Sequence, residues 1–246
     1  MPSDDPLRQL LDLPGVSAAT DATRADVDRL LAHRILRRQS AEVSAESALR
    51  GARASAALAG SAYQLEAVRA GGIDDPVLAG ALRVSAGLGA MVETWSRAPL
   101  QVLARLHVLA AAGLVPTEQL GRPAVATGGR LTALAELVAA RSAAPALVLA
   151  AVVHAELLAL APFGSADEVV ARAAYRLTLV ARGVDPKSVT VPEVGHLELS
   201  REYDDALVGY RAGGPDGVTA WLRHCCAAVS LGAQEGLAVC EAILRG

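Results

Sequence analysis

The residues whose types and spacing suit chemistry lie in one stretch of the chain, from His154 to Arg172. It holds a histidine, two adjacent carboxylates at Asp167 and Glu168, and an arginine. Histidine exchanges a proton near neutral pH, carboxylates act as acids, bases or cation ligands, and arginine binds phosphate or carboxylate groups. The chain's only phenylalanine, Phe163, follows a long apolar run here, and a helix is predicted to begin at Asp167.

A purely structural role for the same residues is also open. Pro162 to Asp167 has the composition of a loop between two helices. Asp167 would then cap the second helix, Glu168 would complement its dipole, and Phe163 would fill the core. A buried, hydrogen-bonded core position is the favoured interpretation of His154.

The order of these residues resembles the signature of the Fic (Fido-fold) family, whose AMP-transferring members read HPFxxGNGRxxR. Laid on the signature without gaps, Pro162, Phe163 and Arg172 match, and Ala161 stands at the motif histidine. The family also holds magnesium with an acidic residue just before the GNGR run, and Ser165 is the nearest equivalent here. Together with Ser165, the positions that differ from the family are Ala161, Ala166, Asp167, Glu168 and Val169.

The resemblance implies that the catalytic groups of the family are missing here. Alanine at position 161 cannot take a proton from a hydroxyl. The family holds phosphates on backbone N–H groups at a helix N-terminus, where glycines allow close approach. Here Ala166 and Glu168 replace both glycines, and Asp167 and Glu168 oppose an anion. Ser165 is a poor sole ligand for magnesium. We therefore predict no catalytic residue, no cofactor and no metal ion.

A second part of the resemblance lies near the N-terminus, at Ser55, Ala59 and Gly60. Many Fic proteins carry an inhibitory helix with the pattern Ser/Thr-x-x-x-Glu-Gly/Asn, whose glutamate ties up an arginine of the GNGR run. Ser55 and Gly60 match this pattern, whereas Ala59 replaces the glutamate and Val169 replaces the arginine. The resemblance implies that inhibition and catalysis were lost together. An alanine-rich helix also produces such a hexamer by chance.

Weaker matches follow the family order along the chain. Leu106-His107 resembles the start of a family helix, and the segment 121–129 loosely resembles its flap. The stretch 201–207, which contains Tyr203, resembles a recurring segment after the motif. The resemblance covers roughly residues 45 to 235, and the order of its motifs is its main support.

The composition favours an all-α fold. Hydrophobic residues make up 52% of the chain and aromatic residues 3%, with alanine and leucine prominent. We expect a Fic-like helical bundle, at least about 60% helical, around a central buried helix ending near Leu160. At most a small β-hairpin is expected near residues 116–130, and Val189 to Leu199 is predicted to be an extended loop. The predicted division is an N-terminal helical extension, 1–40, and a Fic-like helical domain, 41–246.

Charge and hydropathy exclude several classes of protein. A net charge of −3 argues against a nucleic-acid binder. The N-terminal residues lack the apolar core of a secretory signal, so we expect a cytoplasmic protein. The apolar run 145–163 contains His154 and Glu156 and suits a buried helix better than a membrane span. The three cysteines indicate reduced core thiols, and the preference for arginine over lysine indicates a GC-rich genome, such as an actinobacterial one.

The function predicted from these features is a catalytically inactive Fic-like protein that acts as a regulatory or protein-interaction module. Its protein partner is unknown, and the sequence leaves a homodimer open. The alternative is a nucleotide- or phosphate-handling enzyme or ligand binder that uses His154, Asp167, Glu168 and Arg172 in the same cleft. An unrelated helical bundle is the third interpretation.

Overall fold

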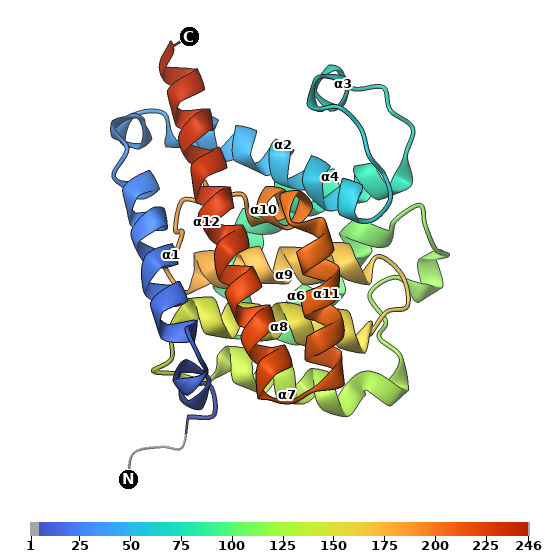
Figure 1. The fold of residues 1–246 in the computed structure, drawn as a ribbon. Coiled ribbons are helices and arrows are strands. Elements are labelled where there is room, and N and C mark those ends of the chain that lie inside the picture. Colours follow the sequence, from blue (N-terminus) through green and yellow to red (C-terminus); the bar gives the residue numbers. More distant parts are fainter. Residues whose placement is uncertain (1–4, 246) are drawn as a thin grey trace.

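The computed structural model describes residues 5–245, and it is 76% helical with no strand in that range (Figure 1). This confirms the predicted all-α class. The α-helices are α1 (Val16–Leu31), α2 (Ser40–Leu58), α3 (Leu65–Ala70), α4 (Pro76–Gly87), α5 (Val92–Trp95), α6 (Pro99–Ala111), α7 (Gly128–Ala139), α8 (Ala146–Leu160), α9 (Asp167–Ala181), α10 (Pro192–Glu198), α11 (Ser200–Ala212) and α12 (Pro215–Arg245). Short 3₁₀ turns are η1 (Arg8–Asp12), η2 (Arg34–Arg37), η3 (Leu88–Met91), η4 (Thr117–Gln119) and η5 (Val125–Thr127).

Helix α8 is the predicted central helix, and it ends at Leu160 as expected. Its sequence is apolar on every side, and such a helix is stable only when surrounded by protein or lipid. Residues on all of its faces are buried, including Val148, Val153 and Leu157. Helix α9 runs beside it, and α11 and α12 cover the pair in the view of Figure 1. The helix that leads into the motif is therefore fixed by the core.

Glycines let α10 lie directly against α12. A Cβ atom built on Gly195 would come 2.1 Å from the carbonyl oxygen of Ala228, which no side chain tolerates. A Cβ on Gly232 would likewise meet the backbone of Val191 at 2.6 Å. Because both contacts are with backbone, these two positions set the distance between the C-terminal helices.

Two sequence-based predictions about connections meet different outcomes. No hairpin forms in 116–130, where η4, η5 and the start of α7 take its place. The extended loop predicted for Val189 to Leu199 is wrong in its second half, because α10 begins at Pro192. Proline at the first helical position is favoured, and the valine pattern masked this short helix. Only the first part is extended, where Val191 N–H donates to the Gly232 carbonyl at 3.1 Å.

The division at residue 40 stays a prediction, and residues 1–4 of the proposed extension lie outside the described residues. Within the extension, α1 packs along α12, and the Thr23 hydroxyl donates to the Cys226 carbonyl at 3.1 Å (Figure 1). Two helical stretches, Pro76–Trp95 and Pro215–Arg245, are long and apolar enough to cross a bilayer. Length and composition are weak evidence for a span, because core helices share them.

Candidate functional site

The loop that connects α8 to α9 carries the motif residues, and we call residues 161–166 the motif loop. It begins and ends with an alanine in the left-handed region, Ala161 at φ 42° and Ala166 at φ 52°. Gly164, between them, is at φ 70°. The left-handed region costs a non-glycine residue about 1 kcal/mol or more. Two such residues in one short loop mark it as a strained segment, held in place by the packing of both helices.

Asp167 does not cap α9 as predicted. Ala166 occupies the N-cap position without a side-chain bond, and Asp167 is the first helical residue. Its carboxylate reaches back into the motif loop and accepts the Phe163 N–H at 2.9 Å. Burial raises the pKa of Asp167, while hydrogen bonds from the backbone of Phe163, Gly164 and Ser165 act in the opposite direction. The motif loop therefore directs its N–H groups at a carboxylate of the chain itself.

His107 holds the motif loop from the other side. Its ring stacks on Phe163, with centroids 4.3 Å apart and an interplanar angle of 5°. The Gly121 N–H donates to His107 Nδ1 at 2.9 Å, so the ring hydrogen must be on Nε2. Nε2 lies 3.0 Å from the Ser165 hydroxyl oxygen and donates to it. Burial lowers the pKa of His107, which favours this neutral form.

The segment 121–129, which loosely resembles the family's flap, lies against the motif loop. The Ala124 N–H donates to the Pro162 carbonyl at 2.8 Å, and Gly121 is bound to His107. The next residue, Val125, is 98% exposed. The structure thus brings three separate parts of the sequence resemblance to one place.

The two motifs also meet directly, through Arg172 and Ser55. Arg172 is 1% exposed, and its Nε donates to the Ser55 hydroxyl at 2.9 Å and its Nη2 to the Ser55 carbonyl at 2.8 Å. Its Nη1 has no hydrogen-bond partner among the residues that the structure describes, and Oε2 of Glu168 lies 3.9 Å from it. The inhibitory pattern pairs its helix with the arginine position that Val169 occupies here. The arginine that binds this helix is Arg172.

A cleft of about 540 Å³ opens beside the motif loop. It collects residues from both motifs, including Ala59 at the end of α2 and Ala161 at the end of α8. Pro162, Phe163, Arg172, Ser55 and Gly60 do not line it. Its lining is Ala59, Val77, Ala110, Leu114, Leu158, Ala161, Gly164, Ser165, Ala166, Asp167, Glu168, Val169, Asp204, Leu207 and Arg211.

His154 lies in the core and not in the cleft. It is fully buried, and its Nε2 is 2.9 Å from the Tyr203 hydroxyl, which fits the structural interpretation of this residue. His196 and His224 lie beside it, with His196 Nδ1 2.9 Å from His224 Nε2. The sequence predicted a core position for His154, but not that His196 and His224 would join it. The three histidines come from α8, α10 and α12, so no local pattern connects them.

Within residues 5–245, no group of three or more His, Cys, Asp or Glu side chains is arranged to hold a metal ion. Cys225, Cys226 and Cys240 are buried free thiols. Burial raises the pKa of the Cys226 thiol to about 11, which keeps it protonated and unreactive at neutral pH.

No protein-family model matches the sequence, and a search of curated proteins found no match. Among solved structures, the chain is similar to a Fic family protein from Desulfovibrio desulfuricans G20, known from a crystal structure at 2.70 Å resolution. The TM-score is 0.73 and the sequence identity 17%, over 89% of this chain and 74% of that chain. At this identity the similarity concerns the fold alone. This chain therefore has a Fic-like all-α fold.

Proposed function

We propose that this protein is a catalytically inactive Fic-fold protein that acts as a protein-interaction module. The observation that carries the proposal is the position of Asp167, whose carboxylate accepts the Phe163 N–H at 2.9 Å inside the motif loop. The backbone N–H groups of Gly164 and Ser165 act on the same carboxylate by lowering its pKa, against the effect of burial. An anion in the cleft would compete with this internal carboxylate for the donors of the loop.

Electrostatics support the same conclusion. Asp167, Glu168 and Asp204 line the cleft, and Arg211 is the one cation among the lining residues of the described structure. Two unit charges about 4 Å apart repel by about 4 kcal/mol at an effective dielectric constant near 20. A triphosphate placed against this lining would meet several carboxylates at once. The cleft therefore disfavours the substrate class that the family's signature handles.

No histidine within residues 5–245 is placed to act as the base in the cleft. Ala161 carries only a methyl group, and His154 is fully buried in the core. His107 and Ser165 form a close pair, but His107 donates its Nε2 hydrogen to Ser165, since its Nδ1 is occupied by Gly121. A donor cannot also remove the serine proton. This geometry weighs against the alternative of an enzyme that uses other residues of the cleft.

The proposal includes a cytoplasmic location, an unidentified protein partner, no nucleic-acid partner, and the division into residues 1–40 and 41–246. The net charge of −3 supports the exclusion of nucleic acid. A homodimer is one arrangement that light scattering can test.

The direct test is transfer of AMP from labelled ATP, to the protein itself and to added proteins, with Mg²⁺ or Mn²⁺ present. We expect no transfer and no saturable ATP binding by the wild type. Labelling by the wild type that disappears in Asp167→Ala would contradict the proposal, because it would give Asp167 a catalytic role.

Rebuilding the site provides a second test. Ala161→His alone should restore neither binding nor transfer, because stabilisation of the phosphates is usually the larger contribution. The matched variant adds Ser165→Asp, Ala166→Gly, Asp167→Asn, Glu168→Gly and Val169→Arg to this change. If the sextuple variant folds and binds ATP while the single variant does not, the loss lies in the loop residues. If neither binds although circular dichroism shows an intact fold, the cleft itself is not a nucleotide site.

A further inference from the structure

The cleft beside the motif loop combines an apolar floor with an acidic rim. Val77 of α4, Leu158 of α8 and Leu207 of α11 contribute apolar side chains, and Leu114, which is 38% exposed, extends them toward solvent. Monomeric soluble proteins rarely expose large contiguous apolar patches, and such patches often mark binding sites.

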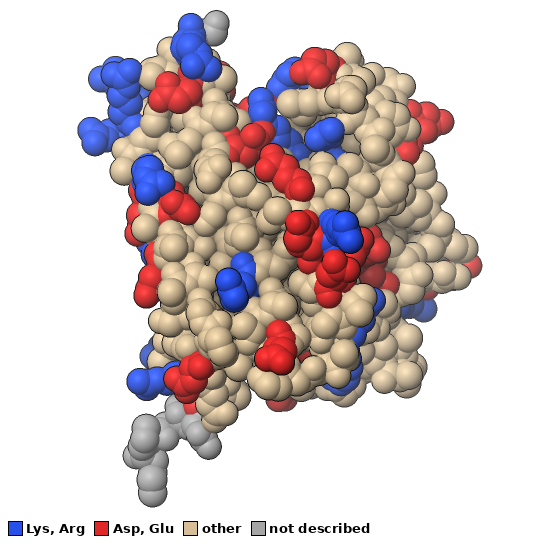
Figure 2. All heavy atoms as spheres, viewed as in Figure 1, with Lys and Arg blue, Asp and Glu red and all other residues tan. Residues whose placement is uncertain are grey.

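The rim carboxylates retain capacity for a cation. Glu168 has a 58% exposed side chain, and its nearest cation, Arg172 Nη1, is 3.9 Å away, beyond hydrogen-bonding distance. Asp204 is exposed and belongs to none of the ion pairs within residues 5–245. Arg211, the basic lining residue, donates to the Leu158 carbonyl at 2.7 Å. Figure 2 shows acidic side chains gathered over α11 on this face of the molecule.

We propose that the cleft binds a segment of a partner protein that presents an arginine or lysine side chain next to an apolar one. The inference rests on the proposed function and specifies its partner. The basic head would lie between Glu168 and Asp204, and its aliphatic stem would cover Leu158 and Leu207. Arginine is enriched among the residues that contribute most to protein interfaces, which suits this pairing.

The apolar floor favours a peptide segment over a small organic cation such as a polyamine. A polyamine would satisfy the rim carboxylates but leave Val77, Leu114 and Leu207 uncovered. A segment with an aliphatic neighbour covers both parts of the cleft. An acidic segment would bring its charge against Asp167, Glu168 and Asp204 and is selected against.

Defined peptides test the proposal on the full chain. The probe is fluorescein-labelled Leu-Ala-Arg-Ala-Leu with a blocked C-terminus, compared with versions in which citrulline or glutamate replaces arginine. Citrulline has nearly the same shape without the charge. We expect the arginine peptide to bind at least about tenfold more tightly than the citrulline peptide at low salt, a difference that shrinks at 0.5 M NaCl. Fluorescence anisotropy gives the Kd values.

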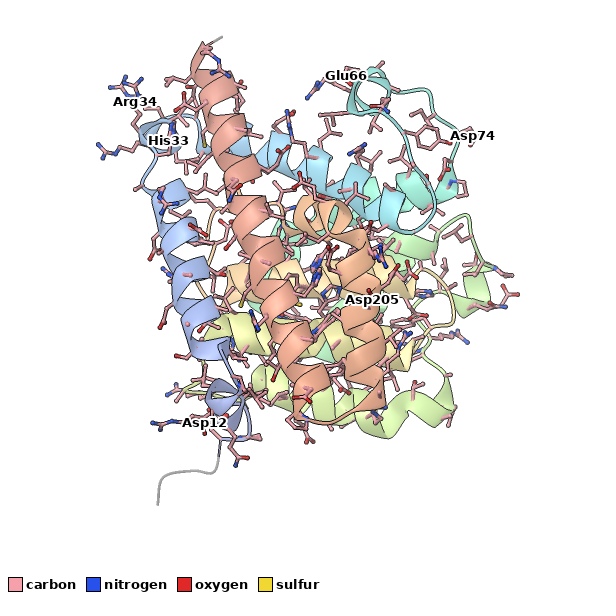
Figure 3. The ribbon with its side chains drawn as sticks, in the orientation of Figure 1. Asp12, His33, Arg34, Glu66, Asp74 and Asp205 are labelled. Atoms are coloured by element: carbon pink, nitrogen blue, oxygen red, sulfur yellow. The ribbon has the colours of Figure 1, made fainter. Side chains whose placement is uncertain are left out.

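Variants locate the binding. Glu168→Gln with Asp204→Asn should remove most of the preference for arginine. The control is Asp205→Asn, the same change one residue along α11 at an exposed position outside the cleft lining (Figure 3). It should keep the wild-type Kd within twofold. Equal binding of the arginine and citrulline peptides, an equal loss in Asp205→Asn, or no saturation at millimolar peptide would each overturn the inference.

An ATP titration of the same samples separates this inference from the proposed function. If Mg-ATP binds tightly, the inactive-protein proposal fails whatever the peptides do. If neither Mg-ATP nor the arginine peptide binds, inactivity stands and only the cation-recognising cleft is wrong.

Discussion

The motif loop and the buried histidines of the core differ in how their polar groups are hydrogen-bonded. We call the second region the imidazole cluster, which consists of His154, Tyr175, His196, Tyr203, Trp221 and His224. The motif loop is one continuous, partly exposed segment whose Phe163 N–H donates to Asp167, the first residue of α9. The imidazole cluster is buried and comes from five helices, and within residues 5–245 His154 Nδ1 and His196 Nε2 have no hydrogen-bond partner.

The contrast indicates which region can change without loss of the fold. A loop that satisfies its own backbone depends little on the chemistry of its other side chains. The imidazole cluster joins α8, α9, α10, α11 and α12, so a change at one ring alters the packing of several helices. We infer that the stability of this chain depends on the cluster, while the loop sets what the cleft can bind.

Acid should have the largest effect, and it should act on the cluster. Burial lowers the pKa of His224 from 6.5 to about 4 and lowers those of His154 and His196 well below 6.5. Arg172 adds to the effect on His154, and Glu202 opposes it at His224. As the pH falls, these histidines therefore take up protons in the unfolded chain before they do so in the folded chain. The free energy of unfolding should have its full value above about pH 6.5 and decrease toward pH 4, with His224 alone accounting for a decrease of about 3 kcal/mol.

Urea unfolding at pH 7.5, 6, 5 and 4 measures this fall. His224→Gln is the control, since it removes one titrating group while the carboxylates that titrate near pH 4 remain. Its stability should depend less on pH than that of the wild type. Equal slopes for the two proteins between pH 6.5 and 4.5 would show that His224 does not carry the linkage.

A single methyl group next to the cluster should have the next largest effect. Gly195→Ala places a Cβ 2.1 Å from the Ala228 carbonyl oxygen and should cost about 2–3 kcal/mol. Gly164→Ala is the matched change in the motif loop. It meets no atom within 4 Å but must adopt φ +70°, so it should cost about 1 kcal/mol. Urea midpoints compare the two, and a larger loss in the loop variant would reverse the contrast.

The sequence predicted the features around the motif loop that depend on local sequence, and it did not predict those that depend on the packed fold. The end of α8 at Leu160, the start of α9 at Asp167 and the loop between them were predictable, because a long apolar run ends there and a short loop-like segment separates it from the next helix. The role of Asp167 was not, because it depends on Ala166 adopting a left-handed conformation that alanine disfavours. The pairing of Arg172 with Ser55 joins residues 117 positions apart, and only the packed fold reveals it.

Asp167→Ala tests whether the internal carboxylate supports the motif loop. Removing it leaves the Phe163 N–H without its acceptor and should cost about 1 kcal/mol. The loop's N–H groups would then be free for an external anion, so added phosphate or sulfate should stabilise the variant more than the wild type. Thermal melts with and without 50 mM sodium phosphate measure both effects. Asp205→Ala, at an exposed position on α11, is the control, and equal stabilisation of the two variants would count against an anion site in the loop.

The smallest predicted effect has the opposite sign. Ala166→Gly relieves a residue held at φ 52° and ψ 14°, a relief of about 1 kcal/mol, part of which the greater freedom of glycine in the unfolded chain offsets. The variant should therefore be more stable than the wild type by about 0.5 kcal/mol. The same change at Ala133, an exposed position inside α7, should instead destabilise by about 1 kcal/mol. Urea unfolding of both variants gives the two signs directly. If Ala166→Gly destabilises as much as Ala133→Gly, the motif loop carries no strain at this position, and its difference from the imidazole cluster would have to come from exposure alone.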